Sequence, residues 1–356
     1  MLSNTRSTVV SVVASLLIAA SAQAHHSFAT HYDANNIVEI SGVLSDVKIR
    51  SPHSFFEVDV TAANGTVETW EVEAHALPIL RRLGVTKDTM KIGDPVAIRG
   101  PRSRRPEKLL LFGAEITMAS GESIEMLNSI RRAPEQRYAD TRENISGVDR
   151  LTGKWLTFIS GQRVAESPMP LTEAGLKARQ NFDAVANSSS ECVPSNLPSL
   201  LMIPYVYEIT RNGDLINIFH EYAKVSRAVI LGASEPNISD PMYGARIGRY
   251  ENDMLIVESS GFPALSAGLA SGWDPNGNGA DIPSSAQKKL VERYLVNEDG
   301  SQMTLRYTVS DPVYLTEPYT AEIDFYRMAD DAPIYDFDCD AEIASRSTHN
   351  AAVLNN

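Results

Sequence analysis

Histidines are concentrated near the start of the chain. Of the seven, five lie between His25 and His75, at His25, His26, His31, His53 and His75. If the chain is cleaved after Ala24, His25 carries a free α-amine beside its imidazole, and His26 adds a second ring. Such a nitrogen-rich set suits Cu(II), the divalent first-row ion with the highest affinity, and zinc is the other candidate. We therefore predict a metal site that His53 and His75 complete if the amino-terminal arm folds back. The alternative is a frayed terminus, with His53 and His75 bonded to buried backbone groups.

A second group of chemically capable residues lies in the second half of the chain. Glu208, Glu292 and Arg293 are the candidate catalytic residues, because a buried glutamate–arginine pair can shift a pKa and exchange protons. The candidates for ligand binding are Tyr207, His220, Glu221, Tyr222, Arg227, Tyr294 and Asp311. Side chains alternate along a strand, so Glu208 faces away from Tyr207, and Arg293 faces away from Glu292. Only half of the set can therefore point inward, and such pairs can equally be structural ties across the end of a barrel.

One stretch resembles the start of a calcium loop. Residues 274–279 read D-x-N-x-N-G, and Asp281 follows, but Ser285 stands where the twelfth position needs a glutamate. A flexible surface loop is the better interpretation. The sequence has no P-loop, no G-x-G-x-x-G, no G-x-S-x-G and no C-x-x-C, which disfavours nucleotide use, the common hydrolase triad and thioredoxin-type chemistry.

The start of the chain, as far as Ala24, has the pattern of a secretory signal. Arg6 precedes an apolar run over residues 9–20, and Ala22-Gln23-Ala24 forms an A-x-A cleavage site. The run is shorter than the roughly 20 apolar residues that a spanning helix needs, and no later stretch spans a bilayer either. We predict a periplasmic or secreted protein without a membrane span. Its net charge of −13 argues against nucleic acid as a partner.

Two cysteines, Cys192 and Cys339, lie in the second half of this exported chain. Export permits oxidation, so a disulfide is predicted, and two buried thiols are the alternative. In the chain-entropy model a loop this long contributes roughly 4–5 kcal/mol.

Residues 25–120 have the strand pattern of a small barrel. The expected strands cover residues 38–44, 54–60, 67–73, 96–98 and 108–117, and an expected helix covers 76–83. An Asn64-Gly65 turn makes a hairpin of the second and third strands. Five strands with one helix between the third and fourth is the order of the OB-fold, although strand patterns this short fit several small barrels.

The rest of the chain predicts a larger barrel. Residues 121–148 carry no strand period and are expected to form a linker, residues 149–345 a second domain, and residues 346–356 a disordered tail. Tight turns at residues 212–214, 251–253 and 298–300 predict three successive hairpins. Successive hairpins close most economically into an antiparallel up-and-down barrel of calycin or lipocalin type, since closure removes exposed edges. The expected fold class is therefore mainly β, with two barrels.

Several motifs resemble known families. The start His25-His26-Ser27-Phe28-Ala29, then Ser51-Pro52-His53, Trp70-Glu71-Val72-Glu73 and Lys91-Ile92-Gly93-Asp94, resembles an uncharacterised family of bacterial exported proteins whose mature chains begin His-His-Ser-Phe. The C-terminal half resembles a second uncharacterised β-rich family through Pro204-Tyr205 to Glu208, Ile247-Gly248-Arg249-Tyr250-Glu251, Glu292-Arg293-Tyr294 and Asp311-Pro312. It departs from that family in the turn Glu251-Asn252-Asp253, where a glycine is usual, and in the insert after Trp273. The resemblance implies a lineage and no activity.

Two functions remain open from the sequence. The first is an exported binding protein that holds a small hydrophobic molecule in the larger barrel, because barrels of this type enclose single ligands. Its smaller barrel would dock a metal or a protein partner that the sequence does not identify. The second is an exported enzyme that acts on a small hydrophobic substrate through glutamate–arginine acid–base chemistry or through copper.

Overall fold

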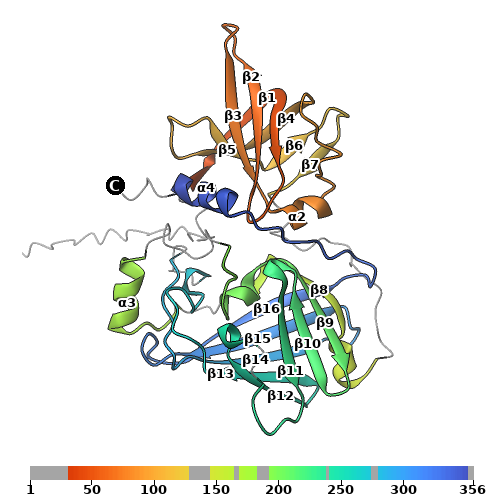
Figure 1. Cartoon of the computed structure of the whole chain (residues 1–356), viewed down its shortest axis with the longest axis vertical. Coiled ribbons are helices and arrows are strands. Elements are labelled where there is room, and N and C mark those ends of the chain that lie inside the picture. The colour runs from red at the N-terminus through yellow and green to blue at the C-terminus, as the bar shows by residue number, and fades with distance from the viewer. Residues whose placement is uncertain are drawn as a thin grey trace, which may run out of the picture.

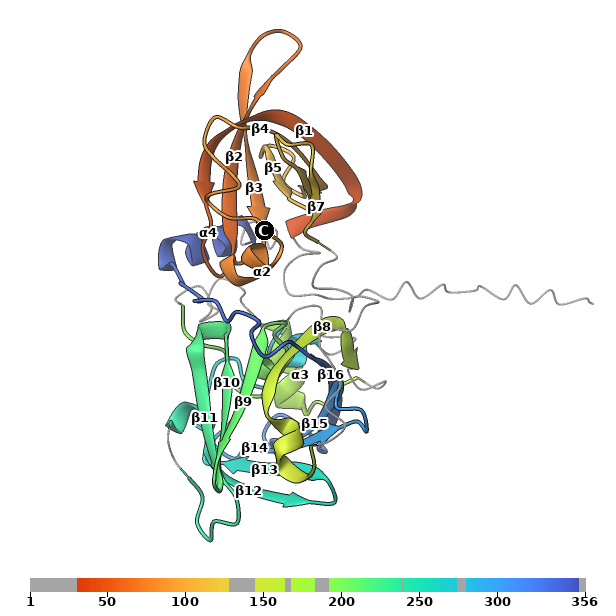
Figure 2. The ribbon, with the colours of Figure 1, turned by 90° about the vertical axis from the view of Figure 1, so that its right-hand side faces the viewer.

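The computed structural model describes residues 31–127, 145–163, 168–182, 192–237, 240–273 and 280–351. The protein is mainly β, with a closed five-strand barrel followed by a nearly closed nine-strand barrel, as the sequence predicted. Figure 1 shows the two barrels one above the other, and Figure 2 shows the same arrangement from the side. No helix in the described ranges is long and apolar enough to cross a bilayer.

The first barrel belongs to a seven-stranded sheet. Its strands are β1 (Tyr32–Lys48), β2 (Ser54–Thr61), β3 (Val67–Ala74), β4 (Pro95–Ser103), β5 (Leu110–Phe112), β6 (Glu115–Thr117) and β7 (Ser123–Glu125), in the order β1-β2-β3-β5-β4-β6-β7. Strands β6 and β7 extend beyond the closed ring of five strands. The additional pairing of β1 with β4 closes the barrel. Helix α2 (Leu77–Arg82) lies between β3 and β4 in the chain, where the sequence predicted a helix.

The long strand β1 closes this barrel because it changes partners along its length. It pairs with β4 as far as Val43 and with β2 from Val43 onward. Gly42 marks this change, since a Cβ there would lie 2.3 Å from the carbonyl oxygen of Asp59. Only glycine permits so close an approach of two backbones.

The second barrel runs up and down through nine strands. They are β8 (Gly153–Arg163), β9 (Val206–Asn212), β10 (Leu215–His220), β11 (Val225–Ile230), β12 (Ala245–Glu251), β13 (Met254–Ser260), β14 (Lys289–Val296), β15 (Gln302–Ser310) and β16 (Tyr319–Arg327). Sequential neighbours pair antiparallel, and β16 returns to pair with β8. Between β11 and β12 only the isolated bridges Leu231–Gly248 and Asn237–Arg246 are recorded among the described residues. The three predicted hairpins are confirmed as β9–β10, β12–β13 and β14–β15.

Short helices complete the second half of the chain. Helix α3 covers Glu173–Gln180, and 3-10 turns cover Gly147–Leu151, Ser199–Met202, Tyr222–Lys224, Pro241–Tyr243 and Ser271–Trp273. The barrel interior is packed with large apolar side chains, of which Trp155, Tyr307 and Phe325 are almost fully buried. Strand alternation sends these residues inward and leaves polar neighbours outside.

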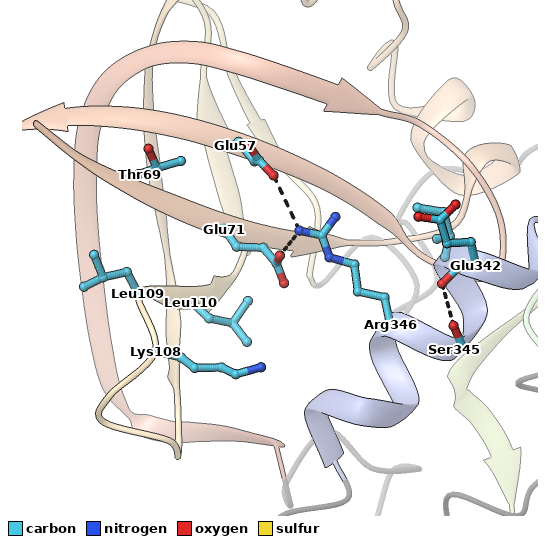
Figure 3. Close-up of a pocket in the computed structure, with 10 residues that line it drawn as sticks. Glu57, Thr69, Glu71, Lys108, Leu109, Leu110, Glu342, Ser345 and Arg346 are labelled. Carbon is cyan, nitrogen blue, oxygen red and sulfur yellow. Dashed lines mark hydrogen bonds and ion pairs between the residues drawn. The ribbon is translucent and has the colours of Figure 1, made fainter.

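The last described helix lies on the first barrel, although the strand before it belongs to the second. Helix α4 (Ala341–Ala351) lies beside β2 and β3, and Arg346 bonds Glu57 and Glu71 on those strands (Figure 3). Helix α4 therefore includes residues 346–351, where the sequence analysis expected a disordered tail. The sequence analysis missed this helix because its anchors, Glu57 and Glu71, lie near the opposite end of the chain.

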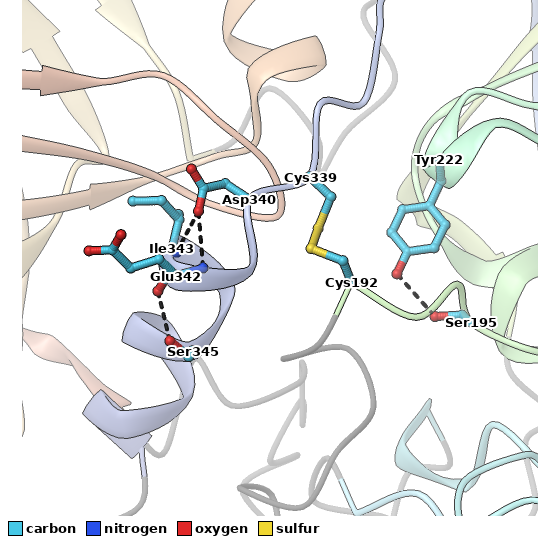
Figure 4. Close-up of a disulfide and its surroundings, with 8 residues drawn as sticks. All are labelled: Cys192, Ser195, Tyr222, Cys339, Asp340, Glu342, Ile343 and Ser345. Atoms are coloured by element: carbon cyan, nitrogen blue, oxygen red, sulfur yellow. Dashed lines mark hydrogen bonds between the residues drawn. A yellow bond between two sulfur atoms is a disulfide. The ribbon is translucent and has the colours of Figure 1, made fainter.

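A disulfide and an apolar cluster join the two barrels. Cys192 and Cys339 are bonded, with 6.0 Å between their Cα atoms (Figure 4), which confirms the predicted disulfide. Cys339 also forms an isolated β-bridge with Ser51 of the first barrel through the backbone. The apolar cluster at this junction is formed by Ala76, Ile79, Tyr205, Tyr222 and Phe337.

Candidate functional site

A buried ion pair lies inside the second barrel. Arg227 of β11 reaches Glu292 of β14 through two hydrogen bonds, Nη1 to Oε2 at 2.8 Å and Nη2 to Oε1 at 3.0 Å. Both side chains have no solvent exposure. Alternation along β11 buries Arg227 together with Val225 and Val229, so the guanidinium points inward. A two-pronged contact of this kind fixes both partners in one geometry.

Two further side chains extend this pair into a network. The hydroxyl of Tyr294 donates to Glu292 Oε1 at 2.6 Å and accepts from Arg227 Nη2 at 3.1 Å. Arg227 Nε donates to Nε2 of His220, the last residue of β10, at 3.3 Å. Tyr207 packs against His220 with 4.1 Å between ring centres, and its hydroxyl donates to the Leu200 carbonyl. The structure therefore brings together five of the predicted site residues, which we call the barrel network.

Burial and charge determine the protonation of the barrel network. Burial favours a lower pKa for Arg227, but the Glu292 carboxylate outweighs it, so the pKa is raised and the guanidinium stays charged. Burial, with the Glu292 charge second, raises the pKa of Tyr294 well above its ordinary value. Burial, and then Arg227, lowers the pKa of His220 well below 6.5. The imidazole is therefore neutral.

Within the described part of the chain, the neutral His220 ring has a donor without a partner. Because Nε2 accepts from Arg227, the ring proton belongs on Nδ1. Among the described residues no hydrogen-bond acceptor meets Nδ1, although the residue is only 1% exposed. Buried donors are nearly always satisfied, so one without an acceptor calls for an explanation such as a bound water or ligand.

The remaining predicted residues of this half lie outside the barrel network. Glu208 and Arg293 are half-buried and alternate away from Tyr207 and Glu292. Asp311 accepts from the backbone and hydroxyl of Ser285, so it ties two loops. Tyr222 packs between the barrels, 4.7 Å from the Phe337 ring.

Two buried cations of this barrel were not predicted from the sequence. Arg246 at the start of β12 is fully buried, and its Nε donates to the Ala228 carbonyl at 3.2 Å. The alternation of inward and outward positions along β12 before Gly248 could have indicated that Arg246 points inward. Lys288 donates to Asn196 Oδ1 and to the carbonyls of residues 197 and 268, and burial lowers its pKa to about 7. Lys288 lies just before β14, so the alternation along that strand gave no indication that Lys288 is buried.

Two histidines of the first barrel, His31 and His53, lie near a buried carboxylate. His53 Nδ1 lies 2.8 Å from Glu73 Oε1, and the Tyr32 hydroxyl donates to Glu73 Oε2 at 2.6 Å. Burial alone favours a higher pKa for Glu73, but His53 and then Tyr32 outweigh it and lower the pKa to about 2. His31 is buried next to Tyr32 and close enough for its charge to act on Glu73. The sequence analysis named the histidines and missed Glu73 and Tyr32.

The other predicted metal ligands are placed differently. His75 is buried, and its Nε2 contacts the Met126 carbonyl at 3.1 Å. His25 and His26 lie outside the described residues, as does the loop 274–279. Within the described residues no three His, Cys, Asp or Glu side chains converge closely enough to hold a metal ion.

A groove of about 730 Å³ lies between α4 and the first barrel (Figure 3). Its apolar lining comes from Leu109, Leu110 and Ile343. Its polar lining is mixed in charge, and Arg346 crosses it to Glu71. None of the candidate catalytic, ligand-binding or metal-binding residues predicted from the sequence lines the groove.

Comparison with known proteins finds a family match over the first barrel. Residues 12–109 match the model of a family of unknown function (DUF6152). No curated protein matches. One similar solved structure is the N-terminal domain of PriB protein from Thermoanaerobacter tencongensis, with 21% identity, a TM-score of 0.19, and coverage of 24% of this chain and 96% of that one.

A second similar solved structure is apo lipid binding protein 8 from Caenorhabditis elegans. It is 12% identical, has a TM-score of 0.27, and the match covers 51% of this chain and 99% of that chain. At such identities and TM-scores these likenesses carry no information on what the chain binds.

Proposed function

We propose that this protein is an exported binding protein whose second barrel holds one small, largely apolar molecule. The observation that carries the proposal is the buried Nδ1 of His220, which has no acceptor among the described residues. A ligand oxygen at this position satisfies the donor, which otherwise costs roughly 1–3 kcal/mol of stability.

The rest of the barrel network supports binding over acid–base catalysis. Glu292 accepts two hydrogen bonds from Arg227 and one from Tyr294, so its carboxylate is fully engaged. A general base needs a lone pair that can reach the substrate. Glu208, the other carboxylate considered, lies on the outer face of β9. The barrel network therefore acts as a rigid support that orients His220.

The surroundings of the barrel network define the ligand class. Tyr207, Phe325 and Tyr307 are buried in the same interior, and aliphatic side chains fill the neighbouring inward positions. Such a lining suits an apolar body with a single acceptor group. Because large side chains already fill much of the interior, the ligand is small.

Export is part of the proposal. Its support is the signal-like start of the chain together with the Cys192–Cys339 disulfide, which persists in oxidising compartments.

Native mass spectrometry on protein purified from a periplasmic preparation tests the binding function. We expect a stoichiometric small molecule that is extracted into organic solvent, and its loss from a His220→Phe variant. Glu208→Gln, on the outer face of a neighbouring strand, is the matched control and should retain the molecule. A wild-type protein that carries nothing, or a His220→Phe variant that retains the full amount, contradicts the proposal. A molecule recovered in chemically altered form indicates an enzyme instead.

A further inference from the structure

Arg105 is buried in the first barrel, and two of its side-chain donors have no acceptor among the described residues. The residue is 9% exposed and lies in the loop between β4 and β5. Its Nε and Nη2 atoms are inaccessible to solvent, and neither has a hydrogen-bond partner within the described ranges. Buried donors of native proteins are nearly always satisfied, and a buried charge without a partner is especially unfavourable. The guanidinium therefore calls for a partner that the described part of the chain does not supply.

The two unfilled donors form one edge of the guanidinium. The Nε–H bond and one N–H bond of Nη2 point in the same direction within the plane of the group. Their spacing matches two oxygens of one carboxylate or phosphate group. A water molecule offers one oxygen and no charge, so it leaves the guanidinium uncompensated. The geometry therefore indicates an oxyanion.

Other arginines of the described ranges differ from Arg105 in this respect. Arg82, Arg102 and Arg150 each have a buried Nε without an acceptor. Each of these three nevertheless donates from a terminal nitrogen to a carboxylate or a carbonyl. Among the described arginines, only Arg105 has both donors of one edge buried and unfilled.

Backbone hydrogen bonds hold Arg105 in place. Its N–H donates to the Ser103 hydroxyl at 3.2 Å, and its carbonyl accepts from the N–H of Lys108 at 3.1 Å. The N–H of Arg104 donates to the His31 carbonyl at 2.7 Å, which ties the loop to the residue before β1. Burial alternates along this stretch, so Ser103 and Arg105 are buried and Arg104 is exposed. A donor edge that is fixed in this way loses little conformational entropy when an anion binds.

The loop around Arg105 is basic, although the chain as a whole is acidic. Residues 102–108 carry four basic side chains and one acidic side chain, a net charge of +3, whereas the whole chain carries −13. Arg102 lies over the Trp70 ring, and Arg104 pairs with Asp33 at 3.8 Å, so these two cations have partners of their own. A local field of this sign favours a doubly charged anion such as phosphate over a singly charged carboxylate.

We propose that Arg105 binds a phosphate group through Nε and Nη2, either as inorganic phosphate or as the terminal phosphate of a small molecule. This site is independent of the ligand proposed for the second barrel. It is also not part of the groove beside α4, whose lining includes Lys108 but not Arg105.

Isothermal titration calorimetry of the full chain with sodium phosphate at low ionic strength tests the site. We expect one equivalent to bind to the wild type. Arg105→Gln removes the charge and the donor edge, so binding should weaken roughly tenfold or more. Arg104→Gln is the matched control, because it removes an exposed cation from the neighbouring position, and its affinity should change by about threefold or less.

Thermal unfolding with and without phosphate keeps the test valid if Arg105→Gln folds poorly. A ligand that binds only the native state raises the thermal midpoint. Phosphate should raise the midpoint of the wild type and of Arg104→Gln by similar amounts. The increase should be smaller for Arg105→Lys, which keeps the charge and loses the paired donors. Equal increases in the wild type and Arg105→Lys contradict recognition through the donor edge.

Titrations with glycerol phosphate and acetate identify the group that is recognised. Glycerol phosphate that binds as tightly as phosphate supports the terminal phosphate of a larger molecule, and binding of inorganic phosphate alone supports the free ion. Acetate that binds more tightly than phosphate overturns the assignment to phosphate. Wild-type affinity in Arg105→Gln, or a wild-type protein that binds no phosphate, overturns the proposal.

Discussion

The two barrels each bury a glutamate, but they neutralise it in different ways. In the second barrel Glu292 is paired with Arg227, a permanent cation, and both side chains are inaccessible. In the first barrel Glu73 is paired with His53, whose side chain is partly exposed, and with Tyr32. The first arrangement is a closed support that needs nothing from outside. The second includes a side chain that the surroundings can reach.

Removing the permanent cation should have the largest effect. Arg227→Met leaves the Glu292 carboxylate buried without its partner, which we expect to cost about 3–5 kcal/mol. Urea unfolding followed by tryptophan fluorescence measures the loss. The Arg227→Met/Glu292→Met double variant should recover most of the stability, because a buried pair can be replaced by apolar groups at little cost. A loss under about 1 kcal/mol in the single variant would show that the buried Glu292 carboxylate does not depend on the Arg227 charge.

Breaking the disulfide tests whether the barrels behave as one unit. Cys192 and Cys339 are 147 residues apart, so Cys192→Ser/Cys339→Ser should lose about 2–5 kcal/mol. The effect should appear in both barrels, because the bond joins residues beside each of them. Hydrogen exchange resolved by mass spectrometry separates the two responses, and faster exchange confined to one barrel would show that they are energetically independent.

Removing one tyrosine hydroxyl from each barrel compares directly how strongly the two buried glutamates depend on their hydrogen bonds. Tyr32→Phe removes the hydrogen bond that Tyr32 donates to Glu73 Oε2, and we expect a loss of about 1–3 kcal/mol. Tyr294→Phe leaves Glu292 with both bonds from Arg227, so its loss should be smaller. Thermal unfolding of both variants under one buffer condition gives the difference. A larger loss in Tyr294→Phe would reverse our ranking of the two carboxylates.

Acid should destabilise the second barrel through His220. Its pKa is lowered in the folded state, so below about pH 6.5 the unfolded chain binds a proton that the folded chain does not. The free energy of unfolding therefore falls as the pH falls, by up to about 1.4 kcal/mol per pH unit for one proton. His220→Gln removes this contribution, and its unfolding free energy should vary less between pH 6.5 and 5. Equal slopes for the two proteins would argue that His220 is protonated when folded.

The smallest effect is expected at the carboxyl end. Arg346 is partly exposed, so Arg346→Ala should change global stability by about 1 kcal/mol or less. Limited proteolysis should nonetheless detect a faster release of α4. Unchanged cleavage would mean that the apolar contacts of Ile343 and Ala344 hold the helix without the ion pairs.

Patterns within single strands explain what the sequence could predict. Alternation along β9 and β14 correctly separated Tyr207 from Glu208 and Glu292 from Arg293, because period two is a local property. The tight turns likewise predicted the hairpins. Whether the separated residues act as a site stays a prediction.

Contacts between distant strands explain what the sequence analysis missed. Tyr32 meets Glu73 across 41 residues, and Arg82 meets Glu221 across 139. Such partners depend on how the sheet closes and on where the barrels touch, which no local period encodes. Glu73 also lies in the motif Trp70–Glu73, which was noted only for its resemblance to a family. Its contact with His53 depends on the fold, so the motif alone did not indicate it.

The return of the chain to its first domain affects the order of events during folding. Residues 339–346 contact residues 51–71. The outer face of β2 and β3 is therefore not covered until residues 339–346 have been synthesised and have docked. Domains generally fold in the order of their synthesis. The strands of the first barrel can therefore form early, but α4 can cover them only after the strands of the second barrel have been synthesised. A carboxyl-terminal tag or a short truncation would consequently alter the domain that is farthest from it in sequence.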